Sequence, residues 1–213
     1  MLLAVVLVIG VLLLKDKIAR NMVEERIRAD TGFEAKLGKL EFSLFSPRVT
    51  VENLVIHNPA EFGGSVFLNA PDVHFEYDRS KLAAGKVHLK LLRLHLVELH
   101  IVEGQNGRTN LIDVLQKVAP ELLPGGGTKG SGYSFGGIDT LNLSLDEVRY
   151  SNLRLPQRNQ VVKLGLKNDL SYNVKSEQDV AGILFKVLFR AGITIYADAM
   201  RGAKQTQTAR VKK

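Results

Sequence analysis

The stretch that most constrains the fold is residues 86–103, KVHLKLLRLHLVELHIVE, in which apolar and polar side chains alternate. A period of two predicts a β-strand with one apolar and one polar face. The apolar positions change parity twice, at Leu91–Leu92 and at Leu96–Val97. We interpret each change as a β-bulge, which inserts one residue and keeps the apolar side chains on one side.

A strand of this length exceeds the roughly 3–10 residues usual in globular proteins and predicts a wide, curved sheet. Its concave surface is apolar. Covered by other elements, that surface is a core; left open, it is a groove for an apolar ligand such as an acyl chain, and the sequence leaves this choice open. The groove candidates are Val87, Leu89, Leu94, Leu99 and Ile101. The same apolar face of the strand also includes one of Leu91 and Leu92 and one of Leu96 and Val97.

Three of the five histidines, His88, His95 and His100, interleave with charged residues on the other face of this strand. At ~3.3 Å per residue, His88 and His95 lie roughly 23 Å apart. The ligands of one zinc ion must converge to about 2 Å from it. We therefore expect a solvated strand face, with no metal-binding or catalytic histidine.

The neighbouring segments also show strand and turn signals. A short helix ends at Gly32, and alternation then resumes on both sides of Gly38. Further strands are predicted over residues 48–58 and over residues 65–78, the second broken at Pro71. A helical turn closes on Gly85, and Thr109 or Asn110 caps a helix that follows the Asn106–Gly107 turn.

The first fourteen residues, MLLAVVLVIGVLLL, carry no charge. As a helix they extend roughly 21 Å, short of the ~30 Å hydrocarbon core, but Lys15 and Lys17 can snorkel and the true start can lie upstream. A signal peptide is the weaker interpretation, because no basic residue precedes the run, and a core helix is weaker still. The predicted membrane anchor comprises Leu2, Leu3, Val5, Val6, Leu7, Val8, Ile9, Val11, Leu12, Leu13 and Leu14.

Residues 119–137 are rich in glycine and are predicted to be a linker, since Lys129 is followed by Gly130 rather than by the Ser or Thr of a phosphate loop. Two strand-like stretches follow, over residues 138–155 and 161–176. Ser176 and Asp179 resemble a capping box for a helix with an apolar stripe. That helix is expected to pack on a sheet, the alternative being a basic helix on an anionic membrane.

Charge is unevenly distributed: residues 151–213 carry 12 Lys+Arg and 4 Asp+Glu, a net charge of +8, whereas residues 1–150 carry 17 and 18, a net charge of −1. A basic final third favours an anionic partner. Nucleic-acid binding is not expected, because no helix-turn-helix, aromatic sheet motif or zinc-ligand pattern is present. The chain has no cysteine and no recognisable catalytic or dinucleotide motif, so we expect neither an enzyme nor a cofactor.

These elements predict a mainly β protein with flanking helices: an N-terminal transmembrane helix, a curved antiparallel β meander with long strands, and an amphipathic C-terminal helix. The predicted organisation has five parts. They are a membrane anchor and juxtamembrane helix (1–30), a β-meander unit (31–118), the linker (119–137), a second β unit with the C-terminal helix (138–200) and a basic tail (201–213).

Residues 1–115 resemble the N-terminal region of AsmA-like proteins. The matching features are the apolar N-terminus, "TG" opening the first strand, "L.NLVIHNP..F", "A.DV.F..D...L..GK", and a long strand ended by "E..G..N". The spacing of these pieces is distinctive. The chain departs from longer members, whose groove could cross the periplasm, because 213 residues cannot.

The resemblance implies a bacterial envelope protein with a single-pass inner-membrane anchor and its body in the periplasm. It also implies a role in phospholipid transport or outer-membrane assembly, with membrane phospholipid and an envelope protein or a second copy as partners. By the positive-inside rule, the cations that follow the apolar run favour a cytoplasmic body. The periplasmic body is preferred, because basic residues that precede the run can be missing from this sequence. The alternative function is a non-catalytic anchored scaffold that binds a protein partner through its basic C-terminal third.

Overall fold

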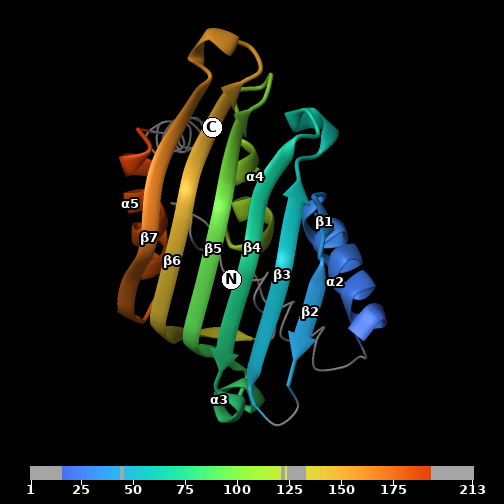
Figure 1. Cartoon of the computed structure of the whole chain (residues 1–213), viewed down its shortest axis with the longest axis vertical. Helices are drawn as coiled ribbons and strands as arrows, with labels where there is room; N and C mark the ends of the chain where they lie inside the picture. Colours follow the sequence, from blue (N-terminus) through green and yellow to red (C-terminus); the bar gives the residue numbers. More distant parts are fainter. Residues whose placement is uncertain (1–15, 44–45, 121–122, 124–132, 193–213) are drawn as a thin grey trace, which may run out of the picture.

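The computed structural model describes residues 16–43, 46–120, 123 and 133–192. Its main feature is one open, mixed sheet in the order β1-β3-β4-β5-β6-β7, with β2 also paired to β3 (Figure 1). The strands are β1 (Glu34–Lys36), β2 (Lys39–Phe42), β3 (Arg48–His57), β4 (Val66–Tyr77), β5 (Lys86–Glu103), β6 (Ser134–Asn152) and β7 (Gln160–Val174).

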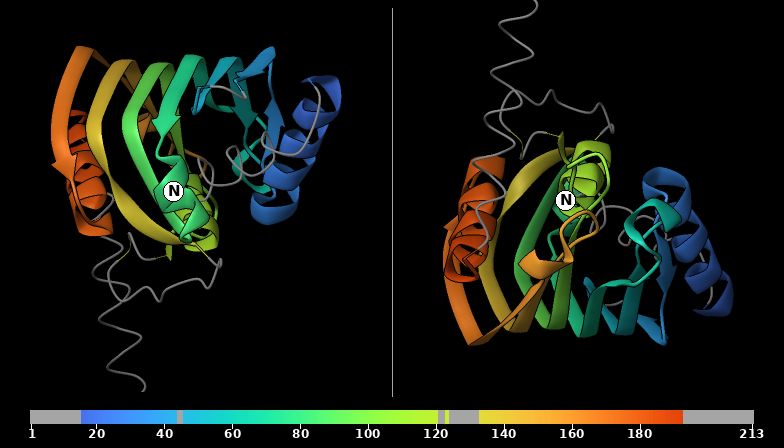
Figure 2. Two further views of the ribbon diagram at one scale, coloured as in Figure 1. Left: turned by 90° about the horizontal axis from the view of Figure 1, so that it is seen from below. Right: turned by 90° about the horizontal axis from the view of Figure 1, so that it is seen from above.

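The sheet is curved, and its helices lie along its edges and on its concave side (Figure 2). Helix α2 runs beside the edge formed by β1 and β2, whereas α4 and α5 lie on the concave side. The helices are α2 (Asp16–Thr31), α3 (Arg79–Ala83), α4 (Asn110–Val118) and α5 (Glu177–Arg190), with short 3-10 turns η1 (Ala60–Phe62) and η3 (Pro156–Arg158).

Several local predictions are confirmed by the geometry of the chain. Helix α2 ends at Thr31 and is followed by Gly32, whose φ of 76° is open to glycine at little cost. Thr109 caps α4 by accepting a hydrogen bond from the Ile112 N–H. The capping box of α5 is complete, because Ser176 and Asp179 each accept from the other's backbone N–H. The predicted break at Pro71 is wrong: β4 continues through it.

The pairing of β5 with β6 is parallel. The prediction of an antiparallel sheet is therefore wrong for this pair of strands. After β5 the chain passes through α4 and returns to the opposite end of the sheet before β6 begins. Parallel neighbours require such a crossover, and a helix is its usual form. β6 begins at Ser134 and pairs with β5 over nearly its whole length, so β6 and β7 extend the same sheet.

The two parity changes of β5 have different structural causes. The first is a bulge against β4, because Glu76 pairs with Leu91 while Tyr77 pairs with Leu89, leaving Lys90 as the additional residue. At the second, around Leu96, the register with β4 shows no shift. The prediction of a bulge there is wrong.

At this second level the neighbouring strands change parity together. On each of these strands, the two successive core-facing residues at this level are three positions apart in the sequence. Their pairing across the strands is unchanged, since Leu96 pairs with Leu145 and Leu99 with Val148. On β3, Asn53 has a φ of 55° between the buried Val51 and Leu54. Because β3, β4, β5 and β6 shift phase at one level, their apolar face stays on the concave side without a change of register among them. The register of β6 with β7, in contrast, shifts twice between Leu143 and Glu147.

Candidate lipid-binding face

The five predicted groove residues of β5 belong to one apolar cluster on the concave side, but they differ in burial. Val87 and Leu89 at one end and Leu99 and Ile101 at the other are at most 6% exposed. Leu94, between them, is only partly buried. The ends of the strand are therefore sealed as core, and only its middle is accessible.

The structure selects between the alternatives that the sequence left open. Leu92 and Leu96 pack against the core beside Leu94. Leu91 instead pairs with Glu76 on the other face of the sheet. The accessible part of β5 is thus a row of three leucines, Leu92, Leu94 and Leu96, which we name the leucine row.

The leucine row continues toward β7 across a buried surface on β6. Leu143 and Leu145 of β6 are 9% and 0% exposed, and they are the partners of Leu94 and Leu96. On β7, Leu164 and Leu166 are again partly buried and pack against the core. The β7 positions were not predicted from the sequence, because their place on the concave face depends on the register of β7 with β6.

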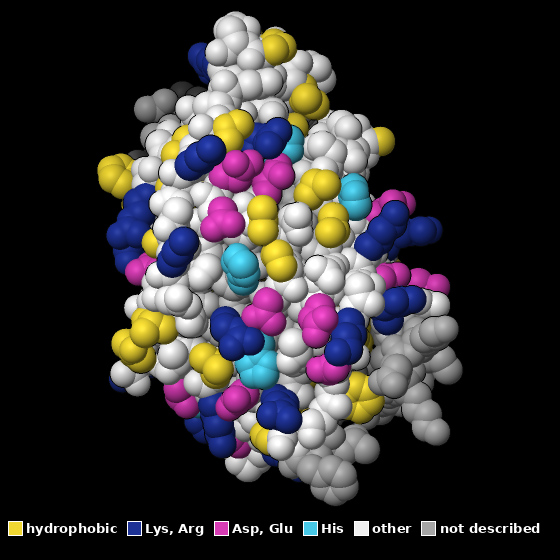
Figure 3. Space-filling model, viewed as in Figure 1, with side chains coloured by type: hydrophobic (Ala, Val, Ile, Leu, Met, Phe, Trp, Pro, Cys, Tyr) yellow, Lys and Arg dark blue, Asp and Glu magenta, His cyan; other side chains and the backbone are white. Residues whose placement is uncertain are grey.

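The opposite, convex face of the sheet is polar (Figure 3). Arg93 of β5 donates to the Asp72 carboxylate of β4 at 2.8 Å, and Arg149 of β6 lies 3.1 Å from Glu98. A shallow cavity of about 500 Å³ opens there, lined by Asp72, Arg93, His95, Ser144, Asp146, Lys167 and Asn168. Two cations and two carboxylates balance in it, so it offers no strong preference for an ion of either sign.

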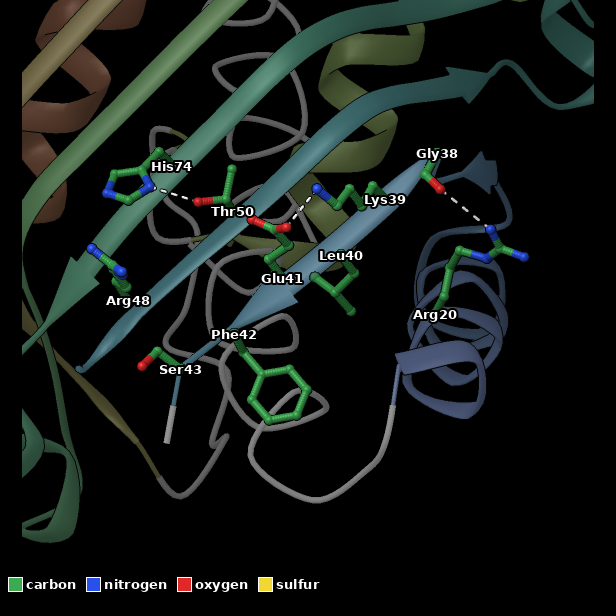
Figure 4. Close-up of a pocket in the computed structure, with 10 residues that line it drawn as sticks. All are labelled: Arg20, Gly38, Lys39, Leu40, Glu41, Phe42, Ser43, Arg48, Thr50 and His74. Atoms are coloured by element: carbon green, nitrogen blue, oxygen red, sulfur yellow. Dashed lines mark hydrogen bonds and ion pairs between the residues drawn. The ribbon is translucent and has the colours of Figure 1, made fainter. Parts of the chain in front are cut away.

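A second polar cavity, of about 580 Å³, lies at the β2 edge of the sheet (Figure 4). Arg20 on α2 and Arg48 on β3 lie at opposite ends of it. Arg20 donates to the Gly38 carbonyl at 3.3 Å, and His74 is hydrogen-bonded to Thr50 at 2.8 Å. Because its arginines do not converge, this cavity is not built to hold one small anion between them.

The three histidines of β5 do not share a site, in agreement with their predicted separation. The predicted solvated face is nevertheless wrong for His88 and His100, each of which is 8% exposed. His88 is hydrogen-bonded to the Gly136 carbonyl at 2.7 Å and lies 3.1 Å from the Asp139 carboxylate. Within the described part of the chain, no three His, Asp or Glu side chains are grouped to hold a metal ion.

His100 belongs to a buried polar network where β5 ends. Its Nε2 is 2.8 Å from the Ser151 hydroxyl and its Nδ1 is 3.3 Å from the Ser65 hydroxyl. Burial lowers the pKa of His100, which favours the neutral ring. Nearby, burial and then the hydrogen bond to Glu103 raise the pKa of Tyr150. These groups fasten the end of β5 to β4 and β6.

Asn110, fully buried at the start of α4, completes this network. Its amide oxygen accepts from the N–H groups of Val102 and Leu111, at 2.9 and 2.7 Å. Its amide nitrogen donates to the Asn58 side chain and to the His100 carbonyl, at 2.7 and 2.9 Å. All four hydrogen-bonding positions of this side chain are used, so it fixes α4 against the sheet.

The predicted membrane anchor, Leu2 to Leu14, lies outside the described residues. Among the helices of the described part, none has the length and apolarity needed to cross a bilayer. Comparisons with protein-family models, curated proteins and solved structures found no match for this chain. The likeness to AsmA-like proteins therefore remains a prediction from the sequence.

Proposed function

We propose that this chain is a membrane-anchored envelope protein whose curved sheet binds the acyl part of a phospholipid on its concave face, in lipid transport or outer-membrane assembly. The observation that carries the proposal is the leucine row. Its three leucines, at alternate positions in the middle of β5, are partly accessible, whereas the apolar side chains at both ends of β5 are buried.

The partly accessible surface of the leucine row favours an apolar ligand. Partly exposed leucines at alternate positions form a continuous strip, and covering it with an acyl chain gains about 25 cal/mol per Å² of apolar surface removed from water. The lipid head would lie beyond this strip, where polar groups and water are available.

The membrane attachment and the location in the envelope rest on the sequence. An uncharged run of fourteen residues precedes α2, and the resemblance to AsmA-like proteins implies an inner-membrane anchor with a periplasmic body. The proposal includes no catalytic step and no cofactor. Membrane phospholipid is the proposed ligand.

Lipid extraction and mass spectrometry on the purified full-length protein test the proposal. Leu94→Asp should remove most of the bound phospholipid, because a carboxylate in the strip costs desolvation that an acyl chain cannot repay. Leu91→Asp is the matched control: it makes the same change on the same strand, on the polar face, and should retain lipid. Equal lipid in both variants and the wild type would count against the concave face as the binding site.

A scaffold that binds a protein through the final third is the second candidate. It is favoured by β7, which is fifteen residues long and has one pairing partner, β6, among the described strands. Free strand edges accept strands from partners. Lys163 and Lys167 and the positive φ of Gly165 and Asn168 oppose such pairing, since charges and irregular backbone protect edges. Crosslinking through β7 that recovers one defined partner would support it.

A further inference from the structure

The apolar strip of the concave face continues onto β7, where Leu164 and Leu166 are only partly buried. Leu166 pairs with the buried Leu145 of β6, so it faces the same side as the leucine row, and Leu164 does so two residues earlier. β7 is the last strand in the order of the described sheet. An apolar surface at this place favours a cover, either from a ligand or from the chain itself.

Helix α5 brings the chain back to these two leucines. It begins directly after β7, and its Lys186 lies 3.3 Å from Asp169 of β7, so α5 runs back along the strand (Figure 1). Over its 14 residues α5 rises about 21 Å, which equals roughly six residues of strand counted back from Val174. The last turn of α5 therefore lies just short of Leu166, and the chain that follows it reaches Leu166 and Leu164.

The end of α5 also sets the direction in which the chain leaves it. Gly192 has a φ of 67°, and its N–H donates to the Phe189 carbonyl at 3.0 Å. This conformation and this hydrogen bond belong to the Schellman motif, in which the residue after the glycine frequently packs on an apolar side chain of the last helical turn. Here these two positions are Ile193 and Leu188, and Leu188 is 1% exposed on the inner side of α5. The motif therefore predicts that the chain leaves α5 toward the sheet.

The sequence that follows has the pattern of a strand with one apolar side, because residues 193–197 read ITIYA. We propose that this segment, which lies outside the described residues, is a strap that covers Leu164 and Leu166 with Ile195 when no lipid is bound. Extended backbone places Ile195 about 7 Å beyond Ile193 and on the same side. An acyl chain needs the same apolar surface, so lipid and strap exclude each other at this end of the strip. The inference rests on the proposed lipid binding and adds its regulation by the chain's own C-terminal segment.

Disulfide trapping in the full-length protein tests the strap, because the chain has no cysteine of its own. Ile195→Cys is combined with Leu164→Cys or with Leu166→Cys, and the control combines it with Lys163→Cys, which lies exposed on the opposite face of β7. A disulfide needs Cβ atoms about 4 Å apart. Mild oxidation of dilute protein should therefore join Ile195→Cys to one of the leucine positions within one chain and leave the control reduced. Equal oxidation of all pairs, or disulfides only between two chains, would overturn the strap.

The trapped protein also tests the regulation, with a phospholipid that carries a fluorescent acyl chain as the probe. The oxidised protein should bind this probe about tenfold more weakly than the same protein after reduction, since the surface of one leucine side chain lost to the acyl chain is worth about that factor. Ile195→Ser in the otherwise unchanged protein should bind it more tightly than the wild type, because the open strip is then populated more often. Equal affinity of the oxidised and reduced forms would overturn the competition. If the probe binds neither form, the proposed function fails and the regulation with it, whereas the disulfide still reports the position of the strap.

Discussion

Leu94 of β5 lies opposite Val73 of β4 on the concave face, and the two differ in burial: Val73 is 6% exposed, whereas Leu94 is partly buried. Paired residues on one face of a sheet usually share their surroundings. At the level of this pair, the boundary between the sealed and the accessible part of the apolar face therefore lies between β4 and β5. Lipid contact is expected on the β5 side of this boundary.

Asn110→Ala should lower the free energy of unfolding by about 2–5 kcal/mol, because it leaves buried backbone and side-chain groups without partners. The measurement is urea denaturation. Asn106→Ala is the control, since Asn106 is exposed and accepts one hydrogen bond, from the Arg108 N–H. A similar, small loss for both variants would mean that water replaces the Asn110 contacts.

Acidification should destabilise the protein through His100. Burial lowers the pKa of His100 in the folded state, so the unfolded chain binds a proton more readily. Stability from this group is unchanged above the unfolded pKa, which lies near 6.5, and falls as the pH drops below it. Between pH 7.5 and about pH 5.5, the midpoint temperature of unfolding should fall less for His100→Gln than for the wild type. An equal fall in both proteins would mean that other groups cause the loss of stability.

Gly137→Ala should destabilise the start of β6 by about 1–3 kcal/mol. The φ of Gly137 is 110°, and an added Cβ would lie 3.1 Å from the Val174 carbonyl oxygen. Gly182→Ala is the control, because Gly182 lies on α5 with open space around it, and a helical alanine is favoured over glycine. We expect the free energy of unfolding to fall for Gly137→Ala and to rise for Gly182→Ala. An unchanged free energy of unfolding for Gly137→Ala would contradict a strained backbone at this position.

Much of the fold could be predicted, because its signals are local. The alternation of β5, the cap of α4 and the capping box of α5 each depend on residues within a few positions of one another. The parallel β5–β6 pairing could not be read in this way. It depends on where the chain returns after α4, and no periodicity records that.

Of the five predicted groove residues of β5, four are sealed in the core and only Leu94 is partly accessible. Alternation identified the apolar side of β5, yet whether Val87 is sealed and Leu94 accessible depends on elements far away in the sequence. The same limit explains the histidines. His100 was placed on a polar face, but Ser65 and Ser151, which make that face a buried network, come from two other strands.

The measurement that tests the central claim most directly is photocrosslinking of the full-length protein with a phospholipid that carries a diazirine in its acyl chain. Peptide mapping should place the lipid on the middle of β5, at Leu92, Leu94 and Leu96, and on Leu164 or Leu166 of β7. It should find little on Val87 or Ile101, which are sealed. Crosslinks confined to the apolar N-terminus and α5, with none on β5, would contradict a lipid-binding concave face.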